Sequence, residues 1–222
     1  MRLSSNPSVI RRMIKVEQAV KEAEIKLAPP AARSNGRIHF ATSGTRLPFY
    51  EATPYIPLLR VIDELRLPSK LHFADLGSGL GMACFAAATY FARVTGFEID
   101  PRLHAEAERI RQAEKVEGIS FLNQDFMAAN LQDFNVLYLF RPFTEYFEFR
   151  AGQKLNETKP GTVVISYVFT NHLLFNVRTF RQIYPVSSSS SLPNHDFLLS
   201  RGFKYAHYTG YLFIPRTSAP RL

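Results

Sequence analysis

At 222 residues, 46% hydrophobic and 21% charged, the chain has the size and composition of one compact globular domain. That composition excludes collagen-like, coiled-coil and wholly disordered proteins. No segment approaches the roughly 18 consecutive apolar residues of a membrane span, and the start, MRLSSNP, lacks the apolar core of a signal peptide. We therefore expect a cytoplasmic protein with no membrane partner.

The cysteine content and the charge exclude further classes of protein and kinds of site. A single cysteine, Cys84, excludes an internal disulfide and the cysteine-rich zinc sites, and the histidines show no metal-ligand spacing, so no metal is expected. The net charge of +8 is uneven, because residues 1–46 and 141–222 each carry +6 whereas residues 47–140 carry −4. Basic flanks around an acidic centre suit nucleic acid, an anionic surface or an acidic protein, and ordinary solubility charge is the simpler explanation.

The apolar pattern changes along the chain. Helical spacing predicts an amphipathic helix between Asn6 and Pro29, followed by a Pro/Gly/Ser-containing connection to about Pro48. From residue 54, helical and strand periods alternate, which predicts a parallel sheet with helices on both faces. The predicted helices are 54–65, 80–92, 100–118 and 144–156, and the predicted strands are 70–76, 93–99, 119–123, 135–140 and 162–169.

The C-terminal end has a different pattern. Two short strands, 204–208 and 211–215, flank Thr209-Gly210, a dipeptide typical of a hairpin turn. A connection this short makes the last strand antiparallel to its neighbours. We divide the chain into an N-terminal helix with its connecting segment (1–48), one α/β domain (49–216) and a tail (217–222).

The most informative segment is FADLGSGLG, residues 73–81, where a predicted strand runs into a glycine loop and then a helix. Glycines let a ligand approach the backbone closely, and a helix N-terminus offers N–H groups. Glu98 ends the next predicted strand, where a carboxylate suits the two hydroxyls of a ribose. The third glycine comes one position earlier than in the dinucleotide fingerprint, and Asp75 is acidic where that fingerprint has no acid, which disfavours NAD.

Four segments in order carry a resemblance to a known family: DLGSGLG (75–81), GFEID (96–100), QDF (124–126) and NVLYLFRPF (135–143). Together they resemble the class I S-adenosylmethionine-dependent methyltransferases. The C-terminal residues 198–215 are similar to that family's last helix and antiparallel hairpin. The resemblance covers about residues 50–215. It implies S-adenosylmethionine as cofactor and a Rossmann-like seven-stranded sheet, mostly parallel with an antiparallel C-terminal hairpin strand.

The resemblance also implies roles for single residues. The methionine part and sugar of the cofactor would be held at the glycine loop, the ribose hydroxyls at the end of the next strand, and the adenine after the third strand. The residues are Asp75, Gly77, Ser78 and Gly79 for the first group, Glu98 for the second, and Asp125 with Phe126 for the third. The segment YEATPY (50–55) resembles the Dot1-like and related protein-lysine methyltransferases, in which a Tyr/Glu/Thr loop caps the cofactor. This implies Tyr50, Glu51 and Thr53 as further cofactor contacts.

The acceptor should lie beside the loops after the fourth and fifth strands, because ligands in such sheets lie beyond the strand carboxyl ends. The candidate catalytic residues there are Phe140, Arg141, Pro142, Phe143 and His172. His172 suits a general base, and it also fits an ordinary loop histidine. The protein-lysine subgroup has Asn where this chain has Arg141. A guanidinium facing the pocket would repel an ammonium acceptor, whereas one facing outward would not.

The sequence therefore predicts methyl transfer, with a protein amine, lysine first, as the acceptor. Two alternatives stay open, because fold alone does not decide function. One is a small-molecule methyltransferase, and the other is a noncatalytic nucleic-acid-binding module on the same fold. The acceptor partner could be an acidic protein, nucleic acid is the less favoured partner, and the sequence does not predict the oligomeric state.

Overall fold

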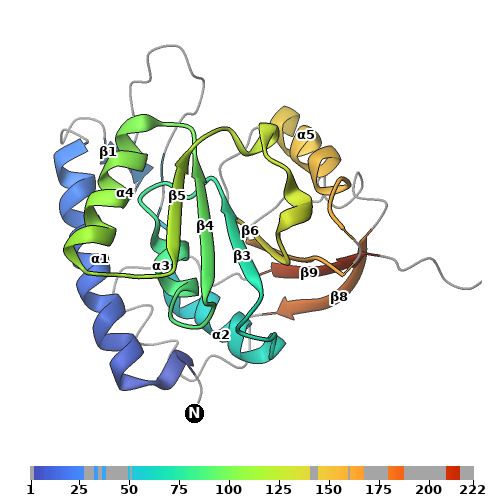
Figure 1. The fold of residues 1–222 in the computed structure, drawn as a ribbon, viewed down its shortest axis with the longest axis horizontal. Helices are drawn as coiled ribbons and strands as arrows, with labels where there is room; N and C mark the ends of the chain where they lie inside the picture. Colours follow the sequence, from blue (N-terminus) through green and yellow to red (C-terminus); the bar gives the residue numbers. More distant parts are fainter. Residues whose placement is uncertain are drawn as a thin grey trace, which may run out of the picture.

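The centre of the protein is a seven-stranded sheet with strand order β5-β4-β3-β6-β7-β9-β8 (Figure 1). The computed structural model describes residues 3–27, 33–34, 37–38, 50, 52–140, 145–159, 161–167, 180–187 and 209–215. The strands of the sheet are β3 (His72–Leu76), β4 (Arg93–Glu98), β5 (Ile119–Asn123), β6 (Val136–Phe140), β7 (Val163–Tyr167), β8 (Phe180–Ser187) and β9 (Thr209–Pro215). The helices are α1 (Pro7–Leu27), α2 (Tyr55–Leu65), α3 (Met82–Ala87), α4 (Pro101–Ala113) and α5 (Glu145–Leu155).

Strands β3 to β7 pair in parallel, and β9 lies antiparallel between β7 and β8. The chain places β4 and then β5 on one side of β3, and returns to place β6 and β7 on the other side. The order therefore reverses between β3 and β6, and in such sheets ligands bind at the carboxyl ends beside this switch point. The predicted mostly parallel, Rossmann-like fold is confirmed.

The C-terminal strands differ from the prediction in one respect. Thr209 and Gly210 lie inside β9 and do not form a turn, and the antiparallel partners of β9 are β7 and β8. The predicted strand 204–208 lies outside the described residues. Strand β8 was missed by the sequence analysis because its Pro185 argues against a strand, but β8 is the last strand in the sheet order, where an edge position tolerates proline.

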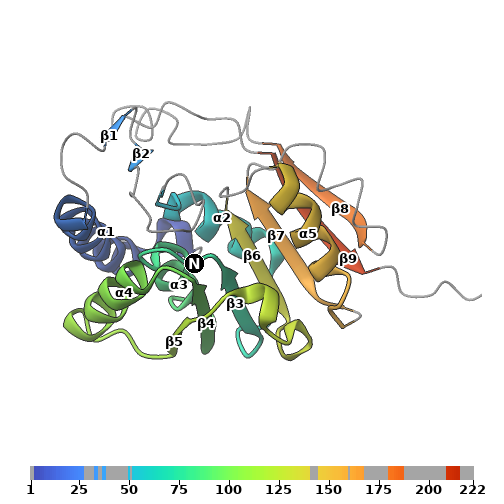
Figure 2. The same cartoon turned by 90° about the horizontal axis from the view of Figure 1, so that it is seen from above.

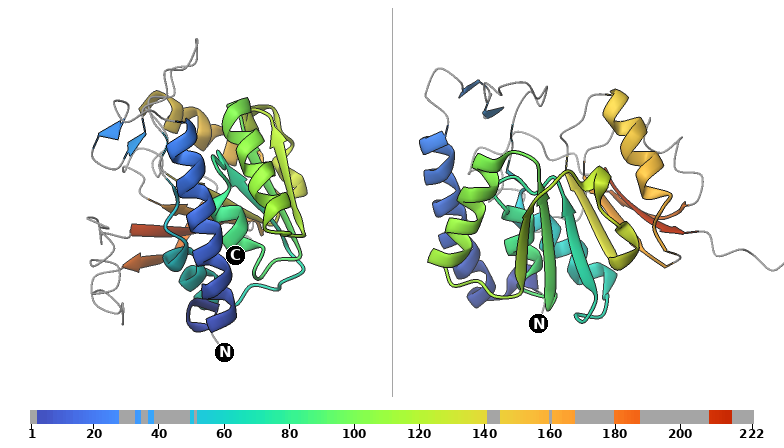
Figure 3. Two further views of the ribbon diagram at one scale, coloured as in Figure 1. Left: turned by 90° about the vertical axis from the view of Figure 1, so that its left-hand side faces the viewer. Right: turned by 45° about the horizontal axis from the view of Figure 1, so that its top comes forward.

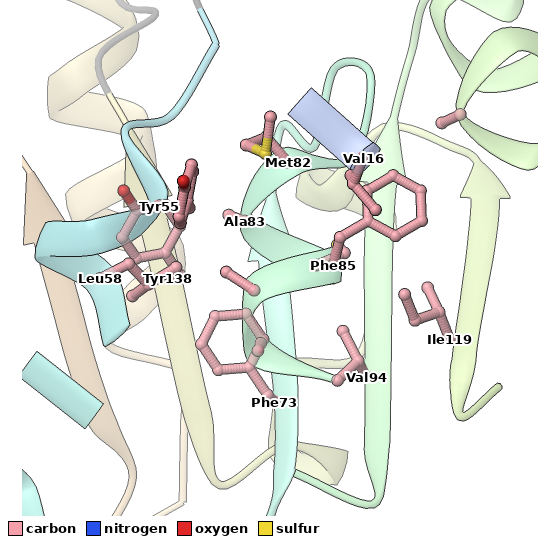
Figure 4. Packing of buried hydrophobic residues seen from close by; sticks show 14 of the residues in the cluster. Val16, Tyr55, Leu58, Phe73, Met82, Ala83, Phe85, Val94, Ile119 and Tyr138 are labelled. Atoms are coloured by element: carbon pink, nitrogen blue, oxygen red, sulfur yellow. The ribbon is translucent and has the colours of Figure 1, made fainter. Parts of the chain in front are cut away.

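Two hydrophobic cores lie on opposite faces of the sheet (Figure 2). The larger core joins the sheet to α1, α2, α3 and α4, and its packed rings and aliphatic side chains include Phe73, Phe85 and Tyr138 (Figure 4). The smaller core joins the sheet to α5 and to two short 3-10 turns, Phe126–Ala128 and Leu131–Asp133. Residues paired between parallel strands share a face, so Asp75 of β3 lies on the larger-core face with its partners Gly96 and Tyr138.

Helix α1 is part of the larger core. Met13, Val16 and Val20 are buried in the stripe predicted from the sequence, and α1 contacts α3 and α4 (Figure 3). Lys26 near its C-terminal end forms an ion pair with Glu106 of α4. Each fully buried aliphatic side chain contributes roughly 1.5–3 kcal/mol, so α1 supplies a substantial part of the stability of the fold.

Two helices end earlier than predicted. Helix α3 ends at Ala87, where the Thr89 hydroxyl donates to the carbonyl oxygen of Ala86 at 2.7 Å and the next turns tighten. Helix α4 ends at Ala113 and not at Gly118, because Lys115 adopts a left-handed conformation with φ of 50°. In the described part of the chain, no helix is long and apolar enough to cross a membrane.

Candidate functional site

The loop between β3 and α3, residues 77–81, lies at the switch point of the sheet, and its N–H groups are engaged within the protein. The N–H groups of Gly77 and Ser78 both donate to the carbonyl oxygen of Phe97, at 3.0 and 2.8 Å. The N–H of Gly81 donates to the carbonyl oxygen of Ser78 at 2.8 Å. A phosphate-binding loop leaves such groups free for the anion, so this loop is not built to hold a phosphate.

The N–H of Gly79, in the same loop, is taken by a carboxylate. Glu98, at the end of β4, is 6% exposed and accepts from the Gly79 N–H with Oε2 at 2.7 Å and from the Asp100 N–H with Oε1 at 2.8 Å. Burial raises the pKa of Glu98, and hydrogen bonds from the backbone N–H groups of Asp100, Gly79 and Ile99 oppose that rise. Each carboxylate oxygen can accept a second hydrogen bond, so Glu98 can still receive ligand hydroxyls.

A second buried carboxyl group lies beneath the loop. Asp75 is 2% exposed, and its Oδ2 lies 3.7 Å from the Sγ of Cys84 on α3, which donates a weak hydrogen bond. Burial raises the pKa of Asp75 to about 8; the Cys84 hydrogen bond opposes this, and the charge of Glu98 adds to it. Burial also raises the pKa of the Cys84 thiol, with Asp75 adding to the effect, so Cys84 is a neutral thiol and not a reactive thiolate.

A buried hydroxyl lies in the same place. The Oγ of Ser78 has no hydrogen-bond partner among the described residues. A Cβ on Gly96 would lie 2.8 Å from this Oγ and 2.9 Å from the Sγ of Cys84. Since Gly96 is the strand partner of Asp75, the serine hydroxyl, the thiol and the Asp75 carboxyl group gather over one glycine of β4.

The side chain of Tyr50 packs directly on the glycine loop. A Cβ on Gly79 would lie only 2.4 Å from the Tyr50 Cε2, and Gly79 has φ of +54°, so only glycine fits at this position. Burial raises the pKa of the Tyr50 hydroxyl well above its usual value, and the negative charge of Glu24 on α1 adds to this. The contact brings a segment that precedes α2 in the chain onto the loop that follows β3.

The carboxyl ends of β4 and β5 present a mixed surface. Ile99 is 43% exposed directly after Glu98, and Leu122 is 40% exposed on the neighbouring strand. Asp125 caps the 3-10 turn Phe126–Ala128 by accepting from the Met127 N–H at 2.9 Å. Phe126 is buried in the smaller core.

Comparisons with known proteins agree with this geometry. The family model described as the ANTKMT methyltransferase domain matches residues 75–172. An RNA methyltransferase from Salinibacter ruber, solved with S-adenosyl-L-homocysteine, superposes with a TM-score of 0.55 at 24% identity, covering 77% of this chain and 97% of that one. The family match and the shared fold together support a class I S-adenosylmethionine-dependent methyltransferase.

Other solved structures share the fold of this methyltransferase. A putative S-adenosylmethionine-dependent methyltransferase from Listeria monocytogenes has a TM-score of 0.52 at 14% identity, covering 73% of this chain and 98% of that one. A point mutant of MtNAS, solved with S-adenosylmethionine, has a TM-score of 0.55 at 18% identity, covering 72% of this chain and 61% of that one. No curated protein sequence matches the chain.

The residues around the glycine loop fit S-adenosylmethionine. This cofactor carries positive charge at its sulfonium and ammonium groups, has two ribose hydroxyls and has no phosphate. The loop matches those properties, because its N–H groups are occupied and the buried carboxyl groups of Asp75 and Glu98 lie beside the unpartnered Ser78 hydroxyl. Among the described residues, no cluster of three His, Cys, Asp or Glu side chains could hold a metal ion.

The structure brings together six of the predicted cofactor residues, and it describes less of the acceptor side of the methyltransferase. The six are Tyr50, Asp75, Gly77, Ser78, Gly79 and Glu98. Thr53 is partly buried just before α2, and Phe140 is buried in the larger core at the end of β6. The predicted residues Glu51, Arg141, Pro142, Phe143 and His172 lie outside the described residues.

Sequence reasoning missed two residues at this site, Cys84 and Ile99. Cys84 is buried, and its hydrogen bond to Asp75 depends on the packing of α3 against β3. Ile99 directly follows Glu98 at the end of β4, and its 43% exposure is known only from the structure.

Proposed function

We propose that this methyltransferase transfers a methyl group to an amine of a protein, with the lysine side chain as the acceptor. The observation that carries the proposal is the packing of Tyr50 on Gly79. Tyr50 begins the YEATPY segment, which resembles the cofactor-capping loop of the protein-lysine methyltransferases, and it lies against the loop that such a segment would cap. The match to the ANTKMT methyltransferase domain model supports the same placement within the family.

We assign the cofactor contacts from the hydrogen bonds and the exposure of the residues around the glycine loop. Glu98 holds the ribose hydroxyls, and the loop from Gly77 to Gly79 holds the methionine part, with the Ser78 hydroxyl as a further donor. Asp125 receives the adenine edge. Ile99 provides the apolar face for the adenine ring, since it is exposed beside Glu98, whereas Phe126 is buried in the smaller core.

Bound S-adenosylmethionine supplies a methyl group on a positively charged sulfur. The remaining tasks belong to the chain: it must align the acceptor nitrogen with the methyl–sulfur bond, exclude water and provide for the proton of the amine. We assign the acceptor side to the residues at and after the end of β6, Phe140 to Phe143. His172 is our candidate for the group that accepts the proton.

The test is transfer of label from S-adenosylmethionine to a cell lysate, followed by separation of proteins, nucleic acids and small molecules. We expect label in the protein fraction, and methyl-lysine after hydrolysis of that fraction. The control is the Glu98→Ala variant, which should bind the cofactor weakly and transfer little label. Label in RNA or in small molecules would replace the lysine assignment by that acceptor, and cofactor binding without any transfer would favour the noncatalytic alternative.

A further inference from the structure

Two buried carboxyl groups share the cofactor loop and have different numbers of donors. Glu98 accepts backbone N–H bonds that include those from Gly79 and Asp100, at 2.7 and 2.8 Å, whereas Asp75 accepts one weak bond from a thiol at 3.7 Å. Among the described residues, no Lys, Arg or His side chain forms a hydrogen bond or ion pair with either group. Two adjacent carboxylates without a counter-ion would both be destabilised by burial.

Among the described residues, the surroundings of Asp75 add no compensating positive charge. The titratable groups that act on it are the Cys84 thiol from α3, the Glu98 carboxyl group from β4 and the Tyr50 hydroxyl from the segment before α2. The residue beside it on β6 is Tyr138, whose ring stacks on Phe73. Each of these groups is neutral when protonated and negative when ionised, so none of them can balance a negative charge on Asp75. The cofactor-free protein therefore avoids two neighbouring negative charges most easily by keeping a proton on Asp75, which has the weaker hydrogen-bond donor of the two carboxyl groups.

We propose that Asp75 is protonated in the cofactor-free methyltransferase and releases its proton when S-adenosylmethionine binds. In this step the O–H bond of the carboxyl group breaks, the proton passes to solvent, and the carboxylate that remains faces the positive charge brought by the cofactor. Cofactor binding is thereby linked to pH. The inference rests on the proposed role of the glycine loop in holding the methionine part of the cofactor.

The raised pKa of Asp75 is consistent with a link between cofactor binding and pH. Burial raises the pKa of Asp75 to about 8, so most of the free protein carries the proton near neutral pH. When a group gives up one proton on binding, affinity below its pKa rises by up to about tenfold for each unit of pH. The amino group of the cofactor also titrates at about pH 8, so a variant without the carboxyl group is needed as a reference.

The experiment is calorimetric titration of the full chain with S-adenosylmethionine between about pH 6 and pH 9, in two buffers that differ in heat of ionisation. The matched reference is Asp75→Asn, which has nearly the same shape and cannot ionise. We expect the native protein to release about one proton more per bound cofactor than the variant near pH 6 to 7. This difference should disappear above about pH 9. S-adenosylhomocysteine, which lacks the sulfonium charge, tests which part of the cofactor faces Asp75.

Extra proton release by the native protein with both ligands would identify the ammonium group of the cofactor as the counter-ion of Asp75. Extra proton release with S-adenosylmethionine alone would identify the sulfonium. Either result supports the proposal. Equal proton release by the native protein and Asp75→Asn would overturn it. If Asp75→Asn does not fold, Cys84→Ala decides the question. Loss of the thiol donor should move the pH midpoint of binding upward, and an unchanged midpoint contradicts the proposal. Failure of the folded native protein to bind S-adenosylmethionine would instead contradict the assignment of the loop as the cofactor site.

Discussion

Buried acids are stabilised differently in the helical layer and at the glycine loop. Between α1 and α4, the 7% exposed Glu106 pairs with Lys26 and, at 2.6 Å, with Arg109. Burial acts to raise the pKa of Glu106, but the hydrogen bonds from these two cations outweigh it and the pKa is lowered. At the glycine loop, Asp75 and Glu98 lie deeper in the protein and have no cation among the described residues, so the effect of burial dominates and both pKa values are raised.

The difference separates a structural acid from a functional one. A buried charge with its counter-ion in place is satisfied by the fold and needs no ligand. A buried carboxylate without one is costly for the fold, unless it takes up a proton or a ligand supplies hydroxyls or positive charge. In this methyltransferase the uncompensated acids gather where the sheet order reverses, which is where a Rossmann-like fold binds its ligand.

The largest expected effect is the loss of stability that follows removal of helix α1. Deletion of residues 1–28 takes Met13, Val16 and Val20 out of the larger core, at roughly 1.5–3 kcal/mol each. Since domains are stable by only about 5–15 kcal/mol, we expect loss of soluble folded protein, measured by expression and circular dichroism. The control Ile25→Ser changes a side chain that is 62% exposed and should leave folding unaffected. A truncated protein with normal stability and turnover would show that α1 is dispensable.

The next effect concerns the shape of the glycine loop. Gly79→Ala would place a Cβ 2.4 Å from the Tyr50 ring at a φ of +54°, so the loop or the ring must move. We expect cofactor affinity to fall more than about tenfold in an isothermal titration, because strain of this kind costs on the order of 1–3 kcal/mol before any clash. Gly161→Ala is the matched control, since Gly161 also has positive φ but no atom within 4 Å. It should reduce stability slightly and leave binding unchanged; equal binding by both variants would remove the loop from the site.

Glu98→Ala tests the uncompensated acid directly. We expect cofactor binding to weaken by roughly 1–3 kcal/mol, the cost of leaving buried hydrogen-bonding groups unpaired, while the fold survives. The control is Glu106→Ala in the helical layer. Its partners Lys26 and Arg109 are half exposed or more, so we expect about 1 kcal/mol or less of lost stability and no change in binding. If both variants bind the cofactor normally, Glu98 does not hold the ribose.

The last prediction concerns the pH dependence of stability. The pKa of Asp75 is raised from 3.8 to about 8 in the folded protein, so the stability it contributes is complete below about pH 4 and is lost as the pH rises toward 8. Thermal unfolding of the cofactor-free protein from about pH 5 to 9 should therefore show a fall that is flatter in Asp75→Asn. Parallel profiles for the two proteins would mean that Asp75 is already ionised in the free state.

Much of the fold and the central part of the site follow from local sequence patterns. The alternating apolar periods predicted strands β3 to β7 in their correct order along the chain. Asp100, at the start of the predicted helix 100–118, caps α4 by accepting from the Arg102 N–H at 2.9 Å. The glycine loop was found because it follows a predicted strand, and Glu98 was found because it lies at the end of the next one. Parallel strands align their carboxyl ends, so the spacing alone indicated that the two would meet.

Only the tertiary structure decided which distant groups share the site. Tyr50 reaches Gly79, and Cys84 reaches Asp75, through the packing of α3 and of the segment before α2 on one face of the sheet, and no periodicity encodes such contacts. The same holds for β8, whose edge position makes its proline acceptable. Local patterns determine which residues form a strand, helix or cap. Burial, and the lack of a counter-ion among the described residues, depend on how distant segments pack, and they distinguish Asp75 and Glu98 from acids such as Glu106, whose cations the fold itself supplies.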